Sequence, residues 1–106
     1  GDLSSGGRKQ LELLMALAGK PKLLLLDEPM AGLGHVESQE MIELLQGLRG
    51  KVSMLLVEHD MEAVFALADR ISVLVYGRVI LTGTVEDIRA SEAVREAYLG
   101  GEEELC

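Results

Sequence analysis

The sequence predicts an α/β fold in which parallel strands are flanked by helices, followed by an antiparallel hairpin and further helices. Two observations indicate this class. Short apolar runs at residues 23–26 and 52–57 are each preceded by a stretch with helical periodicity, so helices and strands alternate along the chain. A tight Tyr76-Gly77-Arg78 turn then joins two further strands, which adds the hairpin.

The first predicted helix follows the segment Leu3-Ser4-Ser5-Gly6-Gly7. Its apolar positions, at i, i+3, i+4 and i+7, lie on one face: Leu11, Leu14, Met15 and Ala18. Ser4 or Ser5 could cap the helix, and the glycines let backbone N–H groups point at an anion. The helix start is therefore a candidate phosphate site, although a serine-glycine loop before a helix is more often only a cap.

The first predicted strand ends in a pair of acidic residues. An apolar run, Leu23 to Leu26, is followed directly by Asp27-Glu28-Pro29. This pattern indicates a buried parallel strand that brings two carboxylates to the carboxyl edge of a sheet. Phosphoryl transfer uses such a pair, because one carboxylate steadies a magnesium ion and its neighbour orients or deprotonates the attacking water. Taken alone, the same residues also fit a core strand followed by a polar turn.

The second predicted strand brings a histidine to the same edge. The loop Ala31-Gly32-Leu33-Gly34 leads into a helix, and the run 52–57 that follows it ends in Glu58-His59-Asp60. An imidazole at that edge could contact a terminal phosphate or the attacking water. An isolated histidine at such a turn is more often structural. The apolar face of the intervening helix comprises Met41, Leu44, Leu45 and Leu48.

The remainder of the chain is predicted to form a helix, the hairpin and a late helix. The third helix has a core face made of Met61, Val64, Phe65 and Ala68. Residues 69–71 lead into the strand before the Tyr76-Gly77 turn, and the strand after the turn ends in Thr82-Gly83-Thr84. Thr84 with Asp87 three residues later resembles a capping box, with Asp in place of the usual Glu, and begins a helix expected to run on toward Tyr98-Leu99-Gly100.

The order of these parts resembles the second half of an ABC-type ATPase, the nucleotide-binding domain of ATP-driven transporters. In this resemblance residues 3–7 match the signature motif, 23–27 the Walker B strand and 31–34 the D-loop. It implies a partial P-loop NTPase-type sheet, with residues 1–100 as the carboxyl-terminal portion of the domain and 101–106 as an acidic tail. The segment 58–61 and the ending of the chain are similar to ATP-binding subunits of branched-chain amino acid importers.

The resemblance also implies roles for individual residues. Glu28 matches the catalytic glutamate, acting as general base or water anchor, and His59 matches the switch histidine that contacts the γ-phosphate. Asp27 would hold Mg²⁺ through water. Ser4 and Gly6 would donate hydrogen bonds to the γ-phosphate of ATP held by a facing subunit. The complete protein would bind ATP–Mg, pair with a second ATPase subunit and with transmembrane permease subunits, and lie on the cytoplasmic face of the cell membrane.

Several features of the family pattern are missing or altered. No G-x-x-x-x-G-K-[ST] phosphate loop, adenine-stacking segment or glutamine loop occurs in these residues, so the isolated chain is expected to be inactive. Ser5 and Gly7 replace the usual glycine and glutamine of the signature, and Gly34 stands where the D-loop commonly has aspartate. These departures leave the roles of the altered positions open.

Composition limits the possible partners and compartments. A net charge of −8 argues against nucleic acid. The single cysteine, Cys106, excludes an intrachain disulfide and fits a reducing compartment, and no apolar run is long enough to span a membrane. Strands that lack their neighbours leave apolar faces and an open edge, so the isolated chain is expected to self-associate.

Two other functions fit parts of the sequence. The first is a truncated, non-catalytic module that only binds, pairing with a full-length subunit or with itself. The second is an ATPase of the chromosome-maintenance or DNA-repair type, which shares the signature and Walker B motifs. The transporter-like ending of the chain argues against the second alternative.

Overall fold

The computed structural model describes residues 5–99, which form two compact units. The first unit ends at Leu67 and the second begins at Ala68. Leu3, Ser4 and the predicted tail at 101–106 lie outside the described residues. The α/β class predicted from the sequence is confirmed, with a parallel pair of strands in the first unit and an antiparallel hairpin in the second.

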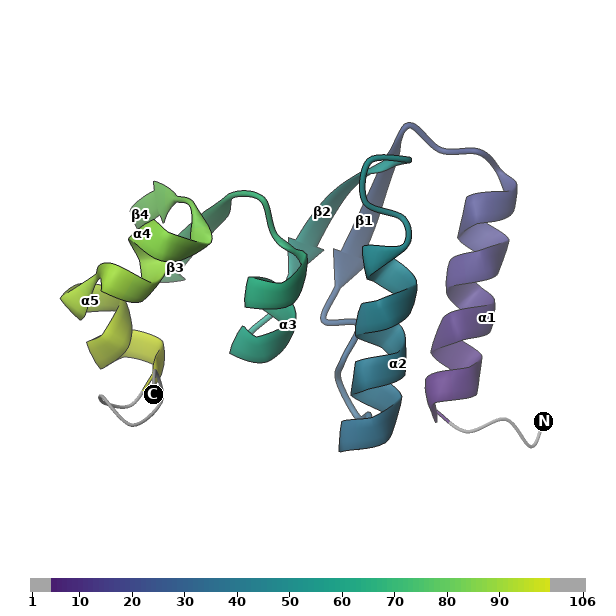
Figure 1. Cartoon of the computed structure of the whole chain (residues 1–106), viewed down its shortest axis with the longest axis horizontal. Coiled ribbons are helices and arrows are strands. Elements are labelled where there is room, and N and C mark those ends of the chain that lie inside the picture. The colour runs from purple at the N-terminus through teal and green to yellow at the C-terminus, as the bar shows by residue number, and fades with distance from the viewer. Residues whose placement is uncertain (1–4, 100–106) are drawn as a thin grey trace. The chain divides into compact units, whose positions relative to one another are not determined.

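The first unit alternates helices and strands in the predicted order (Figure 1). Strands β1 (Leu23–Asp27) and β2 (Ser53–Val57) pair in parallel, with Leu23 opposite Ser53 and Asp27 opposite Val57. The parallel register places the residues that follow the two strands at one edge of the sheet. The three helices of this unit are α1 (Ser5–Ala18), α2 (His35–Gln46) and α3 (Met61–Leu67).

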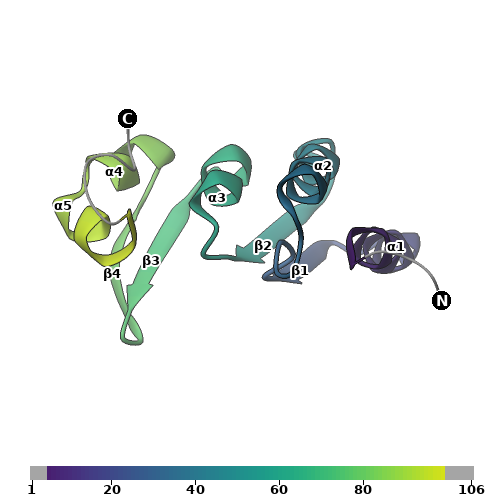
Figure 2. The same cartoon turned by 90° about the horizontal axis from the view of Figure 1, so that it is seen from below.

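The core of the first unit lies between one face of the sheet and helices α2 and α3, which occupy the same side of the strands (Figure 2). Strand side chains alternate between faces, so Leu24 is buried against this core while Leu23 and Leu25 point away. The buried members of the core are Leu13, Leu24, Met30, Met41, Ile42, Leu45, Ala63 and Leu67. Partly buried Leu26 on β1 and Leu56 on β2 pack against this cluster, so the core contacts both strands.

More of the residues predicted to face the core are buried on α2 than on α3. Met41 and Leu45 on α2 are almost completely buried, as the periodicity predicted. On α3 the buried residues are Ala63, Val64 and Leu67, so the predicted face is correct at Val64 but shifted at its other positions.

The predicted apolar face of α1 is exposed in the first unit. Leu11, Leu14 and Met15 expose 47%, 55% and 67% of their surface, whereas Leu13 is buried in the core. The spacing correctly shows that the three residues share a face, but spacing alone does not show which face the rest of the molecule covers.

The second unit begins with the predicted hairpin. Strands β3 (Ile71–Val75) and β4 (Arg78–Gly83) are antiparallel, and the turn residues Tyr76 and Gly77 both have positive φ, 49° and 77°. Two positive φ angles give the turn the twist that a two-residue hairpin requires. The hydroxyl oxygens of Ser72 and Thr82 lie 2.9 Å apart in a cross-strand hydrogen bond.

The late helix is interrupted, contrary to the prediction of one helix running toward Tyr98. Helix α4 (Val85–Ala90) stops at Ser91, and a short α5 (Glu92–Val94) and a π-helical turn η1 (Arg95–Leu99) follow. Ser91 has an extended backbone, and its Oγ accepts a hydrogen bond from Val94 N at 3.3 Å. A serine that caps a new helix competes with continuation of the old one, which explains the break.

The predicted capping box at the start of α4 is confirmed. Thr84 Oγ1 accepts a hydrogen bond from Asp87 N at 3.2 Å, and Asp87 Oδ2 accepts one from Thr84 N at 3.0 Å. Gly83 permits this approach, because a Cβ there would lie 2.6 Å from Asp87 Oδ2. Hydrogen bonds from the Thr84 backbone and side chain lower the pKa of Asp87 below its ordinary value of 3.8, with a smaller contribution from Arg70.

The lowered pKa makes the α4 cap sensitive to acid. A carboxylate whose pKa falls on folding contributes stability above its unfolded pKa, and this contribution is lost as the pH drops through the folded value. We therefore expect the cap to be intact above about pH 4 and to weaken below it. An NMR titration of the Thr84 amide would show this transition. The Asp87→Asn variant should lack it, and an unchanged titration in that variant would contradict the assignment.

Candidate functional site

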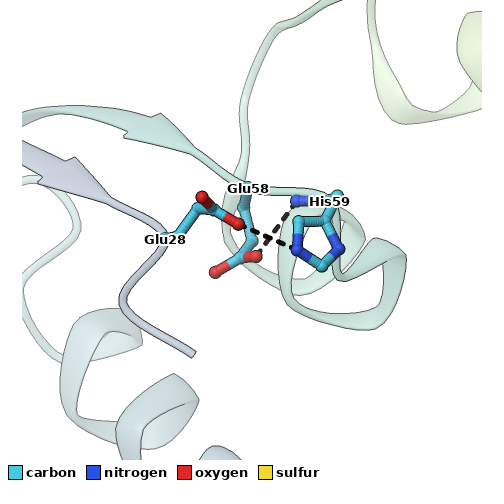
Figure 3. A group of neighbouring side chains, drawn as sticks. All are labelled: Glu28, Glu58 and His59. Carbon is cyan, nitrogen blue, oxygen red and sulfur yellow. Dashed lines mark hydrogen bonds and ion pairs between the residues drawn. The ribbon is translucent and has the colours of Figure 1, made fainter. Parts of the chain in front are cut away.

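The carboxyl ends of β1 and β2 bring together residues from two separate parts of the sequence. Asp27 and Val57 are register partners, so Glu28 and Glu58 are the first residues beyond the paired strands. Figure 3 shows the side chains of Glu28, Glu58 and His59 converging at this edge. Their candidate ligand atoms all lie within 4.8 Å of one another. The two predicted catalytic residues, Glu28 and His59, are therefore neighbours.

The closest contact in the group joins the two predicted catalytic residues. His59 Nε2 lies 2.8 Å from Glu28 Oε1, and the two side chains are 75% and 46% exposed. An exposed pair of this kind contributes little to stability, at most about 1 kcal/mol. Both groups are also open to solvent, so a water molecule or phosphate can reach them. The pair is better suited to chemistry than to holding the fold together.

The backbone turns sharply at Glu28. Its φ is +46°, an uncommon value for a residue with a side chain, and its N–H donates to Val57 O at 2.7 Å. Lys9 Nζ on α1 donates to the Glu28 carbonyl at 3.4 Å. These contacts fix the Glu28 backbone at the point where the chain leaves β1, and its carboxylate contacts His59 there.

Glu58 is a member of the group that sequence reasoning did not single out. Its Oε2 accepts a hydrogen bond from Met30 N at 3.1 Å, and its Oε1 accepts from His59 N at 3.0 Å and from Asp60 N at 3.3 Å. Its position in the sequence could have identified it, because Glu58 directly follows β2 in the same way that Glu28 directly follows β1. Without the strand register, that equivalence is not visible.

Asp27, the residue predicted to hold Mg²⁺ through water, lies at the end of β1 with an exposed side chain. It lines a groove between α1 and β1 whose other lining residues include Lys9, Glu12 and Pro29. It is not a member of the Glu28–Glu58–His59 group. A solvent-facing carboxylate at a strand end suits Mg²⁺, which prefers oxygen ligands and retains several of its waters.

Gly6 is buried near the start of α1, and its backbone N–H is already occupied. It donates to Glu37 Oε2 on α2 at 3.1 Å. A Cβ at this position would lie 2.4 Å from the same oxygen, so the approach depends on glycine. The other predicted signature residue, Ser4, lies outside the described residues. Glu37 was not anticipated, because it lies 31 residues from Gly6 in the sequence.

No helix within residues 5–99 has both the length and the apolar character needed to cross a membrane.

Comparison with known proteins shows which family the chain resembles. A model of the branched-chain amino acid ATP-binding cassette transporter family matches residues 78–104. The ATP-binding protein LivG of high-affinity branched-chain amino acid transport, from Salmonella typhimurium, is 41% identical over 101 residues, which cover 93% of this chain and 40% of LivG. BraF of Pseudomonas aeruginosa is 39% identical over 102 residues, covering 94% of this chain and 40% of BraF.

Solved structures agree with the sequence relatives. The ADP conformation of an ATP-binding cassette of an ABC transporter superimposes with a TM-score of 0.81 at 28% identity, covering 95% of this chain and 42% of the other. A nucleotide-free ATP-binding cassette from an ABC transporter gives a TM-score of 0.80 at 28% identity, covering 96% and 42%.

The fold is that of the carboxyl-terminal part of an ATP-binding cassette. The chain matches the carboxyl-terminal part of ATP-binding subunits of ABC transporters, and it is similar in particular to those of branched-chain amino acid transport. It spans about 40% of the length of the curated relatives that it matches.

Proposed function

We propose that this chain is the carboxyl-terminal part of an ATP-hydrolysing subunit of an ABC transporter that imports branched-chain amino acids. The observation that carries the proposal is the Glu28–His59 contact of 2.8 Å at the carboxyl edge of β1 and β2. Glu28, the first residue after the Walker B-like strand β1, and His59, the second residue after β2, thus bring a carboxylate and an imidazole together. That combination suits the activation of water for phosphoryl transfer.

Each side chain at the edge has a task in this proposal. Glu28 would orient the attacking water or accept its proton, and His59 would exchange its contact with Glu28 for one with the γ-phosphate. Asp27 would hold Mg²⁺ through water, and the ion would neutralise phosphate charge. Gly6 would donate its N–H to a γ-phosphate across a dimer only after the Glu37 carboxylate leaves, because that carboxylate now accepts the same hydrogen bond.

The transported substrate is inferred from the names of relatives. LivG and BraF are ATP-binding proteins of high-affinity branched-chain amino acid transport. A lipopolysaccharide export ATP-binding protein, LptB of Haemophilus influenzae, is also 33% identical over 99 residues. Subunits with different cargo therefore share this sequence pattern. The higher identity of LivG, 41%, and the family match at residues 78–104 favour amino acid import.

The proposed assembly contains further subunits. A second ATP-binding subunit would face the first, so that the signature of one covers the nucleotide held by the phosphate loop of the other. Transmembrane permease subunits would couple closure of this pair to transport. The complete subunit would then lie on the cytoplasmic side of the cell membrane as a peripheral protein.

The isolated 106-residue chain is proposed to be inactive, because its sequence supplies no phosphate-loop lysine. The test is to measure ATP–Mg binding and hydrolysis by this chain beside a full-length subunit. The full-length subunit is a chain that carries these residues together with the amino-terminal part present in the relatives. Hydrolysis by the full-length subunit alone supports the proposal. Hydrolysis by neither chain would contradict the proposed activity, and turnover by the short chain would contradict its inactivity.

A second candidate function, a self-associating module without catalysis, is favoured by one specific observation. The sheet face opposite α2 and α3 is apolar and exposed, as Leu23, Leu25, Leu55 and Val57 are all more than half exposed. Both strands of the described sheet are also edge strands. An uncovered apolar face with open edges promotes pairing with another chain.

Charges on this face should reduce association. In the isolated chain we expect Leu25→Lys combined with Leu55→Lys to shift the solution mass toward one chain, because both side chains point away from the core. Sedimentation of the wild-type chain and the variant at matched concentrations would show the change. Val36→Lys is the control, since Val36 is 71% exposed but lies on α2. Equal masses for the wild-type chain and the double variant would contradict association through the sheet.

A further inference from the structure

Glu58 connects the two segments that carry the reacting side chains. Its Oε2 accepts from Met30 N at 3.1 Å, in the loop that leaves β1, and its Oε1 accepts from His59 N and Asp60 N, in the loop that leaves β2. A carboxylate is suited to this position because it only accepts hydrogen bonds and has two oxygens to divide between the loops. The same side chain therefore contacts both sides of the site.

The His59 side of the site is fixed by its neighbours in the chain. The segment is held by β2 on one side and by the start of α3 on the other, where Asp60 Oδ1 accepts a hydrogen bond from Ala63 N at 3.3 Å. The His59 side chain itself is 75% exposed, so packing does not fix its position. What sets its distance from Glu28 is the spacing between the two loops.

The Glu28 side of the site is attached to β2 at only a few points. Glu28 N donates to Val57 O at 2.7 Å, which is the last backbone link between the strands. Beyond it the chain turns away from the sheet, and Met30, 5% exposed, enters the core. The hydrogen bond from Met30 N to Glu58 spans 28 residues of sequence and ties this turn to the His59 loop.

We propose that Glu58 is a positioning residue that keeps the His59 imidazole within reach of the Glu28 carboxylate by tying the loop after β1 to the loop after β2. This inference rests on the proposed function, because it concerns the geometry of the proposed hydrolytic pair. Glu58 does not act on ATP in this arrangement. It acts through His59 and Glu28, and its loss should lower the rate of hydrolysis without weakening nucleotide binding.

Two substitutions in the full-length subunit separate this role from a general effect. Glu58→Gln is isosteric, but it replaces one acceptor oxygen with an NH₂ group that cannot accept from a backbone N–H. If its remaining oxygen serves His59 N and Asp60 N, the bond to Met30 N is lost. Glu58→Asp keeps the charge but withdraws the carboxylate by one methylene. Both variants should lower kcat about 10-fold with little change in KM for ATP.

A double-mutant cycle with His59→Ala tests whether Glu58 acts through His59. If it does, Glu58→Gln added to His59→Ala should cause no further loss of kcat. Effects that multiply would overturn the proposal. Glu62→Gln is the matched control, because Glu62 is an exposed glutamate on α3 that accepts a hydrogen bond from Gln39 Nε2 at 2.7 Å, away from the site. Its rate should equal that of the wild type.

Amide hydrogen exchange at Met30 supplies a readout independent of catalysis. Glu58→Gln should speed exchange of this amide, and Glu62→Gln should leave it unchanged. Faster exchange of the Met30 amide together with a lower kcat supports the proposal. If either the exchange rate or kcat of Glu58→Gln equals that of the wild type, the proposal is overturned. A wild-type subunit that hydrolyses no ATP would instead overturn the proposed function. If the wild-type subunit hydrolyses ATP and the Glu58→Gln variant has the same kcat, only the positioning role is contradicted.

Discussion

Replacing Glu28 by glutamine in the full-length subunit is expected to leave ATP binding intact while nearly abolishing turnover. The amide matches the carboxylate in size and its oxygen can still accept from His59 Nε2, now 2.8 Å from Glu28 Oε1. What it loses is the negative charge that, in the proposed mechanism, orients water and accepts a proton. Because general base catalysis contributes about 10²–10⁴-fold, kcat should fall by at least about 100-fold. Nucleotide titration and phosphate release measure the two quantities separately.

The control for this substitution is Glu43→Gln, a change of the same kind on the exposed surface of α2. It should leave both binding and turnover at the wild-type values. A Glu28→Gln subunit that hydrolyses ATP at the normal rate would show that Glu28 is not the catalytic carboxylate. A parallel loss of ATP binding would show that its role is in binding rather than in the chemical step.

Replacing Leu45 by alanine is expected to have the largest effect on stability. Leu45 is 1% exposed and packs in the core of the first unit. Removing a buried leucine costs about 2–5 kcal/mol through lost transfer energy and the cavity left behind. Small domains are stable by only about 5–15 kcal/mol, so much of the first unit's stability should be lost. Urea unfolding followed by a probe in the first unit measures the change.

Leu25→Ala is the matched control for the core substitution. Leu25 is also a leucine of the first unit, but 66% of its surface is exposed on the open face of the sheet. Its replacement should change the free energy of unfolding by no more than about 0.5 kcal/mol. Similar losses in the two variants would mean that the open face is covered in solution, which would support self-association through that face.

Strand β1 and its acid pair could be predicted from the sequence, because an apolar run followed by charge is a local signal. The structure places the strand at Leu23–Asp27, as expected. The placement of Glu28 and His59 at the same edge of the sheet also followed, because two parallel strands deliver the residues after them to one edge. Their direct contact was not predicted from the sequence. Where the prediction depends on sequence order and strand direction alone, it agrees with the structure.

Features that depend on long-range packing were not predictable. The bond from Gly6 N to Glu37 and the bond from Met30 N to Glu58 join residues 31 and 28 positions apart, and each has a backbone N–H as its donor. Every residue except proline has a backbone N–H, so the sequence does not show which of these groups will donate to a distant side chain. The break at Ser91 was missed for a different reason, because a serine is compatible with both a helix interior and a helix cap.

The most direct test of the central claim is the solution mass of the full-length Glu28→Gln subunit with and without ATP–Mg. If two ATP-binding subunits close around nucleotide and hydrolysis reopens them, the variant should be trapped as a pair. Its mass should then double on addition of ATP–Mg and remain that of one subunit without it. The wild-type subunit, which hydrolyses ATP, should return to one subunit as nucleotide is consumed. A Glu28→Gln subunit that binds ATP–Mg but stays monomeric would contradict the proposal that this chain completes a nucleotide site between two facing subunits.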